Sequence, residues 1–420
     1  MKEVKRETYL KSLIDSRGNS MVKVITGIRR CGKSYLLNTL FYDYLISEGV
    51  KERHIVKVNL EEKSYRSLLS PGALEAYVKE RLEPEVLNYV FIDEVQKAPE
   101  FEAVVSELNN LPNTDVYVTG SNSQFLSSDI ITEFRGRGDE IRVHPFSFAE
   151  FCVAKNALEH PETVWREYMN FGGMPLSLSF GTEERKSAYL KGLFQEVYFS
   201  DIKERHDLKD DVELASVVDA LASNVGSLTN PHRLANYFEN AGVKNITEAE
   251  VKEYIYYLVD AFLISKAERY DIRGNKYLST PSKYYYEDVG LRNARLNFRQ
   301  QEVGHLMENI LYNELRNWGF NVDVGLVEVN ATEDGKNVRK QYEVDFVCNQ
   351  VDKRYYIQSA FAVADADKMR QETEVYKRIG DAFKKVVVTM ENIRPYRDER
   401  GVLFVGLMDF LLKPEVLREG

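Results

Sequence analysis

Short runs of apolar, β-branched residues alternate with amphipathic stretches over the first 150 residues of the chain. Four runs are apolar and short, and therefore predict buried strands, at 21–26, 55–60, 89–93 and 115–119. Helical patterns separate them, at 33–45, 72–82 and 100–108. Because strand and helix alternate in this way in parallel sheets, the pattern predicts an α/β domain at residues 1–147.

The pattern becomes helical after residue 147. Residues 148–210 are expected to form a helical lid or connector. Within them, Gly172-Gly173-Met174-Pro175 breaks the helical pattern and favours a tight turn over a ligand contact. Residues 211–290 then show three helices, at 213–225, 231–239 and 247–259, and a hairpin-like stretch. This order is typical of a winged helix.

The last segment, 291–420, returns to mixed structure. An amphipathic helix is expected at 302–318. After it the pattern predicts three strands, a helix and a last strand, at 321–329, 341–348, 354–360, 367–380 and 385–389. At 420 residues, a prior of about 150 residues per domain gives roughly three domains, which agrees with this division of the chain.

Charge and cysteine content restrict the classes of function. The 66 acidic residues outnumber the 56 basic ones, so the net charge of -10 argues against a protein that wraps a polyanion. Cys31, Cys152 and Cys348 lie far apart, and their spacing predicts neither a zinc site nor a disulfide framework. The start of the chain is charged, and the longest apolar stretch, 401–412, is too short to span a bilayer. These features predict a cytoplasmic protein without a membrane partner.

The acidic balance also bears on the expected winged helix. Residues 211–290 carry eight basic against twelve acidic side chains, and the third helix presents Glu248, Glu250 and Glu253 around Lys252. Such a surface repels phosphates, so we expect protein docking or a structural role in preference to DNA reading. Nucleic acid stays an alternative because three basic residues lie on the expected hairpin, namely Arg269, Arg273 and Lys276. Tyrosines cluster at 254–257 and 284–286, where we expect packing or a docking face.

A phosphate-binding motif joins the first predicted strand to the following helix. Residues 27–34, Gly-Ile-Arg-Arg-Cys-Gly-Lys-Ser, match G-x-x-x-x-G-K-[ST] in full. The glycines let backbone N–H groups surround phosphate oxygens, and the helix N-terminus adds positive potential. Lys33 is expected to reach the β- and γ-phosphates, and the Ser34 hydroxyl to ligate Mg²⁺. The predicted nucleotide-binding residues are Gly27, Ile28, Arg29, Arg30, Cys31, Gly32, Lys33, Ser34 and Tyr35.

Two carboxylates end the third predicted strand. The run Tyr-Val-Phe-Ile leads directly into Asp93 and Glu94, and the carboxyl edge of a parallel sheet is where such domains bind ligands. We expect Asp93 to hold Mg²⁺ through water and Glu94 to polarise the attacking water. A strand that ends in solvated acids is a common event, but its coincidence with the phosphate-binding motif favours the functional interpretation.

Further candidates follow the fourth predicted strand. Asn122, or in second place Ser121, is expected to orient water against the γ-phosphate. Beyond them, Arg135 and Arg137 flank a glycine and suit the neutralisation of charge during phosphoryl transfer. They could act in the same subunit or in a neighbouring one, and a solvated basic turn is the alternative.

Taken together, these residues resemble a known family. The motif at 27–34, the run Phe-Ile-Asp-Glu-Val-Gln-Lys at 91–97, Thr-Gly-Ser-Asn at 119–122 and the segment 135–151 look like prokaryotic AAA-superfamily P-loop ATPases with a C-terminal domain of unknown function. Gly172–Pro175 also resembles a feature of that family. The resemblance implies an ATPase core, a helical lid, a winged-helix region and a C-terminal α/β domain similar to restriction endonucleases.

The nuclease-like resemblance can be tested residue by residue. Such a core needs carboxylates around a divalent metal and a lysine that activates water. Glu308 and Asp345 lie where two of the carboxylates are expected, but Gln358 and Ala360 stand where the pattern requires an acid and a lysine. We therefore expect a catalytically inactive domain at 291–420. The alternative is a relocated lysine, for which Lys368 is the nearest candidate.

The sequence thus predicts an ATP- and Mg²⁺-dependent ATPase whose nucleotide state controls the packing or partner binding of its C-terminal domains. Two alternatives remain open: a nucleotide-gated interaction protein with negligible turnover, and a DNA-binding ATPase with residual metal-nuclease activity. An unidentified protein partner is expected, and an oligomer is compatible with the motifs.

Overall fold

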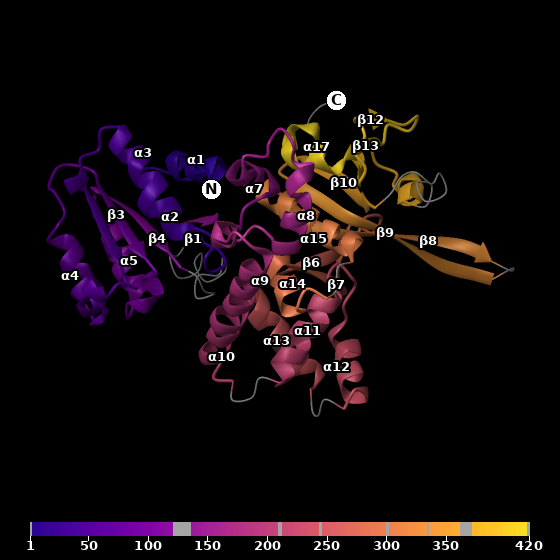
Figure 1. The fold of residues 1–420 in the computed structure, drawn as a ribbon, viewed down its shortest axis with the longest axis horizontal. Coiled ribbons are helices and arrows are strands. Elements are labelled where there is room, and N and C mark those ends of the chain that lie inside the picture. Colours follow the sequence, from indigo (N-terminus) through magenta and orange to yellow (C-terminus); the bar gives the residue numbers. More distant parts are fainter. Residues whose placement is uncertain are drawn as a thin grey trace. The chain divides into compact units, whose positions relative to one another are not determined.

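A computed structural model of the protein describes residues 2–120, 136–208, 212–242, 246–299, 302–333, 336–361 and 372–417 (Figure 1). The chain divides into two compact units. The N-terminal unit comprises Glu3–Pro145 and Asp260–Phe262, and the C-terminal unit comprises Met1–Lys2, Phe146–Val259 and Leu263–Gly420. No helix in the described ranges has the length and apolar character needed to cross a bilayer.

The N-terminal unit is built on a five-stranded, all-parallel sheet in the order β2-β3-β4-β1-β5. Its strands are β1 (Val22–Thr26), β2 (Ile55–Asn59), β3 (Asn88–Asp93), β4 (Thr114–Thr119) and β5 (Gly138–Arg142). Its helices are α1 (Glu7–Asp15), α2 (Lys33–Tyr35), a π-helical segment (Leu36–Phe41), α3 (Tyr42–Ser47), α4 (Ala73–Lys79) and α5 (Phe101–Asn109). The predicted parallel α/β sheet is confirmed.

Burial explains which strands of this sheet the pattern predicts. All residues of β1 and β3 are buried, and apolar side chains of the strands pack against α4 and α5 in one core. The pattern does not predict β5, whose sequence Gly-Asp-Glu-Ile-Arg contains a single apolar residue. This strand lies at the edge of the sheet beside β1, where polar side chains can face solvent.

The C-terminal unit contains an eight-stranded mixed sheet in the order β12-β13-β11-β10-β9-β8-β6-β7. Its strands are β6 (Ile264–Asp271), β7 (Lys276–Tyr286), β8 (Asn321–Glu333), β9 (Lys336–Gln350), β10 (Lys353–Ala360), β11 (Lys384–Thr389), β12 (Tyr396–Arg397) and β13 (Leu403–Gly406). A core between this sheet and the chain around Tyr376 holds its central strands together.

Helices of the C-terminal unit precede and interrupt the sheet. They are α7 (Phe148–Lys155), α8 (Glu162–Phe171), α9 (Glu183–Gly192), a π-helical segment (Leu193–Phe199), α10 (Ser200–Arg205), α11 (Val212–Ser223), α12 (Pro231–Asn240), α13 (Glu248–Asp260), α14 (Val289–Arg295), α15 (Val303–Asn317) and α17 (Leu407–Leu412). The three segments expected after residue 147 therefore share one compact unit.

The hairpin β6–β7 links the expected winged-helix segment to the C-terminal sheet. β6 pairs in parallel with β8 at Arg269–Asp271, so the hairpin belongs to the same sheet as β9 and β10 (Figure 1). The tyrosines Tyr284, Tyr285 and Tyr286 are at most 6% exposed and pack in the core, whereas Tyr256 is 55% exposed. The winged-helix and endonuclease-like descriptions of these elements stay predictions.

The Gly-Gly-Met-Pro segment forms a close packing contact within this unit. Gly172 has φ +68°, and a Cβ on Gly173 would lie 2.1 Å from the carbonyl oxygen of Phe146. The buried Asp288 carboxylate accepts a hydrogen bond of 2.6 Å from the Gly173 N–H and also caps α14. These contacts support the expected turn, because they leave no room for side chains at the two glycines.

Candidate nucleotide-binding site

The phosphate-binding motif forms the loop between β1 and α2, at the carboxyl edge of the parallel sheet. Gly27 has φ +135°, and a Cβ at this position would lie 2.1 Å from the Val143 carbonyl oxygen. Gly32 has φ +107° and directly precedes the helix. Both positions require glycine, and the loop leads into a helix N-terminus as phosphate binding demands.

The remaining loop side chains divide into buried and exposed groups. Ile28 and Cys31 are fully buried, and the Cys31 thiol lies 3.2 Å from the Val143 carbonyl oxygen, to which it can donate. Arg29 forms an ion pair of 3.1 Å with Glu61. Arg30 (φ +69°) and Tyr35 are exposed. The buried pair anchors the loop, and Arg30 and Tyr35 lie on its exposed side.

Lys33 points into the loop. Its Nζ donates hydrogen bonds to the carbonyl oxygens of Gly27, at 2.9 Å, and Ile28, at 3.3 Å, and the residue is only 4% exposed. A lysine ammonium has three donors and no acceptor. It can therefore exchange these carbonyl contacts for phosphate oxygens when a nucleotide enters the loop.

Asp93 lies beside the Ser34 hydroxyl at the end of β3. The Ser34 Oγ donates to Asp93 Oδ1 at 3.0 Å, and Asn38 Nδ2 donates to Oδ2 at 3.3 Å. Burial raises the pKa of Asp93 above its ordinary value, against the opposing hydrogen bonds from Thr119 and Ser34. A carboxylate and a hydroxyl are oxygen donors of the kind that Mg²⁺ prefers, so these two residues fit the expected metal.

Glu94 follows Asp93 in a left-handed backbone conformation, with φ +54°. Its N–H donates to Thr119 Oγ1 at 3.0 Å, and its carboxylate accepts a hydrogen bond from the Gln96 amide. The side chain is 7% exposed. This backbone conformation turns Glu94 away from the direction of β3. The Thr119 hydroxyl, at the end of β4, holds Glu94 beside Asp93.

Two residues that contact Asp93, Thr119 and Asn38, are not among those predicted from the sequence. The Thr119 hydroxyl donates to Asp93 and accepts from the Glu94 N–H, so it holds both acidic residues at once. A feature of the sequence could have identified each of these two residues. Thr119 ends the strand next to β3, and Asn38 lies four residues after Ser34, one helical turn along the same face.

The predicted polar and arginine residues after β4 have different outcomes. Ser121, Asn122 and Arg135 lie outside the described residues. Arg137 precedes β5 and donates to Asn110 Oδ1 at 2.8 Å, while its carbonyl accepts from the N–H of Val22, the first residue of β1. This is the amino edge of the sheet. Arg137 thus lies at the opposite edge from the phosphate-binding loop of its own chain, which is at the carboxyl edge, and its role in catalysis stays a prediction.

A second group of predicted residues comes together in the C-terminal unit. Glu308 on α15 and Asp345 on β9 both face Lys283, whose Nζ lies 2.8 Å from Glu308 Oε1 and 3.8 Å from Asp345 Oδ1. Gln358 on β10 accepts from the Asp345 N–H at 3.3 Å. Ala360 is buried near the end of β10. Lys368, the expected relocated lysine, lies outside the described residues.

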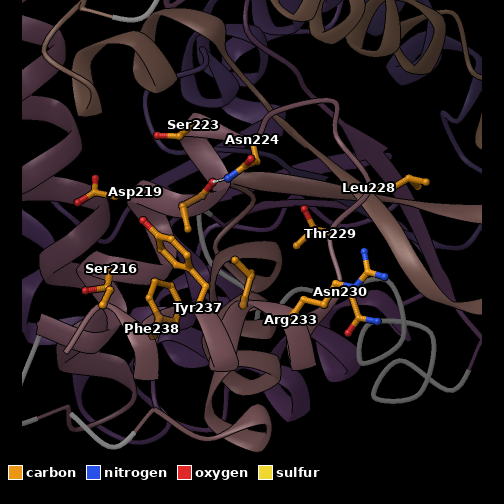
Figure 2. A pocket seen from close by; sticks show the side chains of 13 residues that line it. Ser216, Asp219, Ser223, Asn224, Leu228, Thr229, Asn230, Arg233, Tyr237 and Phe238 are labelled. Carbon is orange, nitrogen blue, oxygen red and sulfur yellow. Dashed lines mark hydrogen bonds between the residues drawn. The ribbon is translucent and has the colours of Figure 1, made fainter. Parts of the chain in front are cut away.

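A hollow of about 640 Å³ lies between α11 and α12, away from the predicted residues (Figure 2). Its lining includes the aromatic rings of Tyr237 and Phe238, and Asp219, whose carboxylate is held by two hydrogen bonds from Arg295 at 2.6 and 2.9 Å. Asn230 caps α12 by accepting from the His232 N–H. Asp219 and Asn230 thus already serve the local fold.

Comparison with known proteins agrees with the geometry of the phosphate-binding loop. A family described as an AAA domain matches residues 19–152, and a domain of unknown function matches residues 162–302. The chain is 33% identical over 414 residues to an uncharacterized protein of Haemophilus influenzae, covering 98% of this chain and 99% of the relative. The chain belongs to this family of AAA-domain proteins.

The chain is also similar to a second relative and to solved structures. An uncharacterized protein of Methanocaldococcus jannaschii is 28% identical over 394 residues, covering 90% of this chain and 82% of the relative. Among solved structures, a Walker-type ATPase of Pyrococcus abyssi superposes with a TM-score of 0.51 at 15% identity, covering 70% of this chain and 96% of that one. At this identity the likeness supports the P-loop ATPase fold and does not extend to partners.

Proposed function

We propose that the protein is a Mg²⁺-dependent ATPase whose nucleotide state controls the packing or partner binding of its C-terminal unit. The observation that carries the proposal is the arrangement at the carboxyl edge of the sheet. Lys33 lies within the loop, and Ser34 lies 3.0 Å from Asp93, with Glu94 held next to it by Thr119. These are the groups that phosphoryl transfer to water requires.

Each side chain has a distinct part in the proposed reaction. Loop N–H groups and Lys33 bind the phosphates of ATP, and Ser34 and Asp93 hold the metal. When bound, Mg²⁺ neutralises charge on the phosphate oxygens. Glu94 accepts a proton from the attacking water, which its position beside the loop allows. Thr119 orients both acids through its hydroxyl.

The experiment is phosphate release by the purified full-length chain, with and without Mg²⁺. We expect Lys33→Ala to lose nucleotide binding, because no other ammonium replaces its contacts with the phosphates. Glu94→Gln keeps the size of the side chain but removes the base, so ATP binding persists while turnover falls by about 10²-fold or more. Lys51→Ala and Glu100→Gln, at exposed positions of the same unit, serve as matched controls. Wild-type protein that neither binds nor hydrolyses ATP refutes the proposal.

A nucleotide-gated interaction protein with negligible turnover is the second candidate. It is favoured by one contact, the hydrogen bond from the Gln96 amide to the Glu94 carboxylate, which occupies an oxygen that the proposed base would use to accept a proton. Equal and near-zero phosphate release by wild type and Glu94→Gln supports this candidate. Faster release by Gln96→Ala than by wild type shows instead that the contact restrains an active enzyme.

Asn122, Arg135 and Arg137 remain candidates for the same reaction. We propose Asn122 as a group that orients water, and the two arginines as groups that act on the nucleotide of a neighbouring copy in an oligomer. Mixing Arg137→Ala with Lys33→Ala protein tests the arginine role, because only an intermolecular site can restore turnover in the mixture. Sedimentation with a non-hydrolysable nucleotide measures whether such an oligomer forms.

A further inference from the structure

Three carboxylates from two elements meet in the C-terminal unit, two of them largely buried and that of Glu343 33% exposed. α15 contributes Glu308, and β9 contributes Glu343 and Asp345, which lie two residues apart and so share one face of the strand. Glu308 is 9% exposed, and a Cβ on Gly226 would lie 3.3 Å from its carboxylate carbon. The two largely buried carboxylates, Glu308 and Asp345, require a cation, and the nuclease-like resemblance would place a divalent metal here.

A lysine from a different segment reaches all three carboxylates. The Lys283 Nζ on β7 lies 2.8 Å from Glu308 Oε1, 2.8 Å from Glu343 Oε1 and 3.8 Å from Asp345 Oδ1. Lys283 itself is 3% exposed. Lys283 pairs with Ala267 of β6, and its neighbour Ser282 also pairs with Thr229. The Lys283 side chain extends toward α15 and β9, where the three carboxylates lie.

Other donors already occupy the carboxylate oxygens that a metal would need. The Tyr285 hydroxyl donates to Glu308 Oε1 at 2.6 Å, and the Ser359 N–H donates to Asp345 Oδ2 at 2.8 Å. Gln358, which stands where an acid is expected, accepts from the Asp345 N–H and donates to Glu372 at 3.2 Å. Protein donors thus already contact the carboxylates of Glu308 and Asp345, and this arrangement does not fit a divalent cation.

We propose that the Lys283 ammonium is the permanent cation of this cluster and takes the place of a divalent metal. An ammonium has three N–H donors, and three carboxylates surround this one. Within the described ranges, no group of three or more His, Cys, Asp or Glu side chains is arranged to hold a metal ion. Lys283 thereby joins the β6–β7 hairpin to α15 and β9, and the cluster serves the fold of the unit without metal-dependent hydrolysis.

Removal of the ammonium is expected to create a metal site. We would measure thermal unfolding of the nucleotide-free, full-length chain in chelator and in Mn²⁺. Lys283→Ala is expected to lose stability in chelator and to recover part of it in Mn²⁺. At a metal concentration a hundredfold above the dissociation constant, the recovery corresponds to a rise in Tm of roughly 5–10 °C. Adding Asp345→Asn to Lys283→Ala should abolish the recovery.

Matched controls separate this site from the phosphate-binding loop. Wild type and Lys266→Ala should respond to Mn²⁺ equally, because Lys266 lies on the neighbouring strand and pairs with the exposed Glu268. A change in Tm with Mn²⁺ that both proteins show then comes from metal binding at another site of the chain. Mn²⁺ binding by wild type that requires Asp345 overturns the proposal, and so does plasmid nicking by wild type that Asp345→Ala abolishes. A folded Lys283→Ala that ignores Mn²⁺ also overturns it.

A fallback covers the case in which Lys283→Ala does not fold at all. The triple variant Lys283→Met, Glu308→Gln and Asp345→Asn removes the buried cation together with two of its counter-charges. If unpaired charge is the cause of unfolding, this variant recovers a folded state in chelator, as measured by circular dichroism. If it unfolds as fully as Lys283→Ala, charge pairing by Lys283 is refuted.

Discussion

Thr119 is a small side chain on which two acids depend. Its hydroxyl donates to Asp93 and accepts from the Glu94 N–H. Thr119→Val keeps the shape and removes both hydrogen bonds, so Asp93 and Glu94 lose their common support. Because groups that orient a ligand or base are worth about 10–100-fold in activity, we expect phosphate release to fall by about tenfold or more while the fold persists.

Thr114→Val provides the matched control for Thr119→Val. Thr114 begins the same strand, β4, and its hydroxyl donates to the Leu111 carbonyl oxygen at 3.0 Å, at the amino edge of the sheet. Its replacement should leave the rate of turnover within about twofold of wild type once stability is accounted for. If Thr114→Val and Thr119→Val lose the same activity, the loss comes from a disturbed β4 and not from the lost hydrogen bonds to Asp93 and Glu94.

Glu314 on α15 is expected to make stability depend on pH. Its carboxylate accepts from the N–H of Phe148 at the start of α7, and burial raises its pKa from 4.5 to about 8. Between pH 4.5 and about 8, the Glu314 carboxyl group is ionised in the unfolded chain and protonated in the folded chain. Stability therefore falls as pH rises from about 5 to 8, by up to about 1.4 kcal/mol per unit.

Glu314→Gln tests this dependence, since glutamine keeps the acceptor for Phe148 and cannot ionise. Urea unfolding at pH 5 and pH 8 should show that the variant gains stability relative to wild type at the higher pH. The exposed Glu302, just before α15, gives the control Glu302→Gln, for which the two pH values should show no such gain. A pH dependence unchanged by Glu314→Gln would contradict the assignment.

At the scale of elements, the Gly172–Gly173 turn determines how closely α8 approaches α14. Gly173 donates to Asp288, and its carbonyl oxygen accepts from the Phe146 N–H at 2.8 Å. In Gly173→Ala the added methyl group would lie against the Phe146 backbone, which is unable to retreat as a flexible side chain could. We expect a loss of roughly 1–3 kcal/mol in the free energy of unfolding.

Gly181→Ala is the comparison for the turn, because nothing lies within 4 Å of a Cβ at Gly181. Chemical unfolding of the two variants should show a change within about 0.5 kcal/mol for Gly181→Ala. If Gly173→Ala is as stable as wild type, the backbone of the turn can move to accommodate the added methyl group.

Strands made mostly of apolar residues could be predicted from the sequence. Contacts between residues far apart in the chain could not. β1 to β4 are short and mostly apolar or β-branched, and the phosphate-binding motif and Asp93-Glu94 follow from local spacing. β5 escapes the pattern because an edge strand needs few apolar residues. Lys283 precedes Glu308 by 25 residues in another predicted segment, and only the folded sheet brings the two together.

At the scale of the molecule, each unit can be followed separately. Both tryptophans of the chain, Trp165 and Trp318, belong to the C-terminal unit, whereas the phosphate-binding loop belongs to the N-terminal unit. ATP with Mg²⁺ should therefore stabilise the transition of the N-terminal unit seen by calorimetry, and any accompanying shift of the tryptophan transition measures the proposed control of the C-terminal unit. At a hundredfold excess over the dissociation constant, the shift is roughly 5–10 °C.

Lys33→Ala should remove this shift, since it removes the contacts through which ATP stabilises the N-terminal unit. Equal movement of both transitions in wild type would mean that the units unfold cooperatively. That result would make the tryptophans reporters of nucleotide binding, and would favour direct control of the C-terminal unit by ATP.

The contacts of Lys283 also bear on how the C-terminal unit is made and kept. A counter-ion that is part of the polypeptide is present as soon as its strand is synthesised, in a ratio of one to each chain. It cannot be removed by chelators, exchanged for a competing metal or exhausted when metals are scarce. If the proposal holds, assembly of this unit is independent of the cell's metal supply, and any demand for Mg²⁺ is confined to the site that binds ATP.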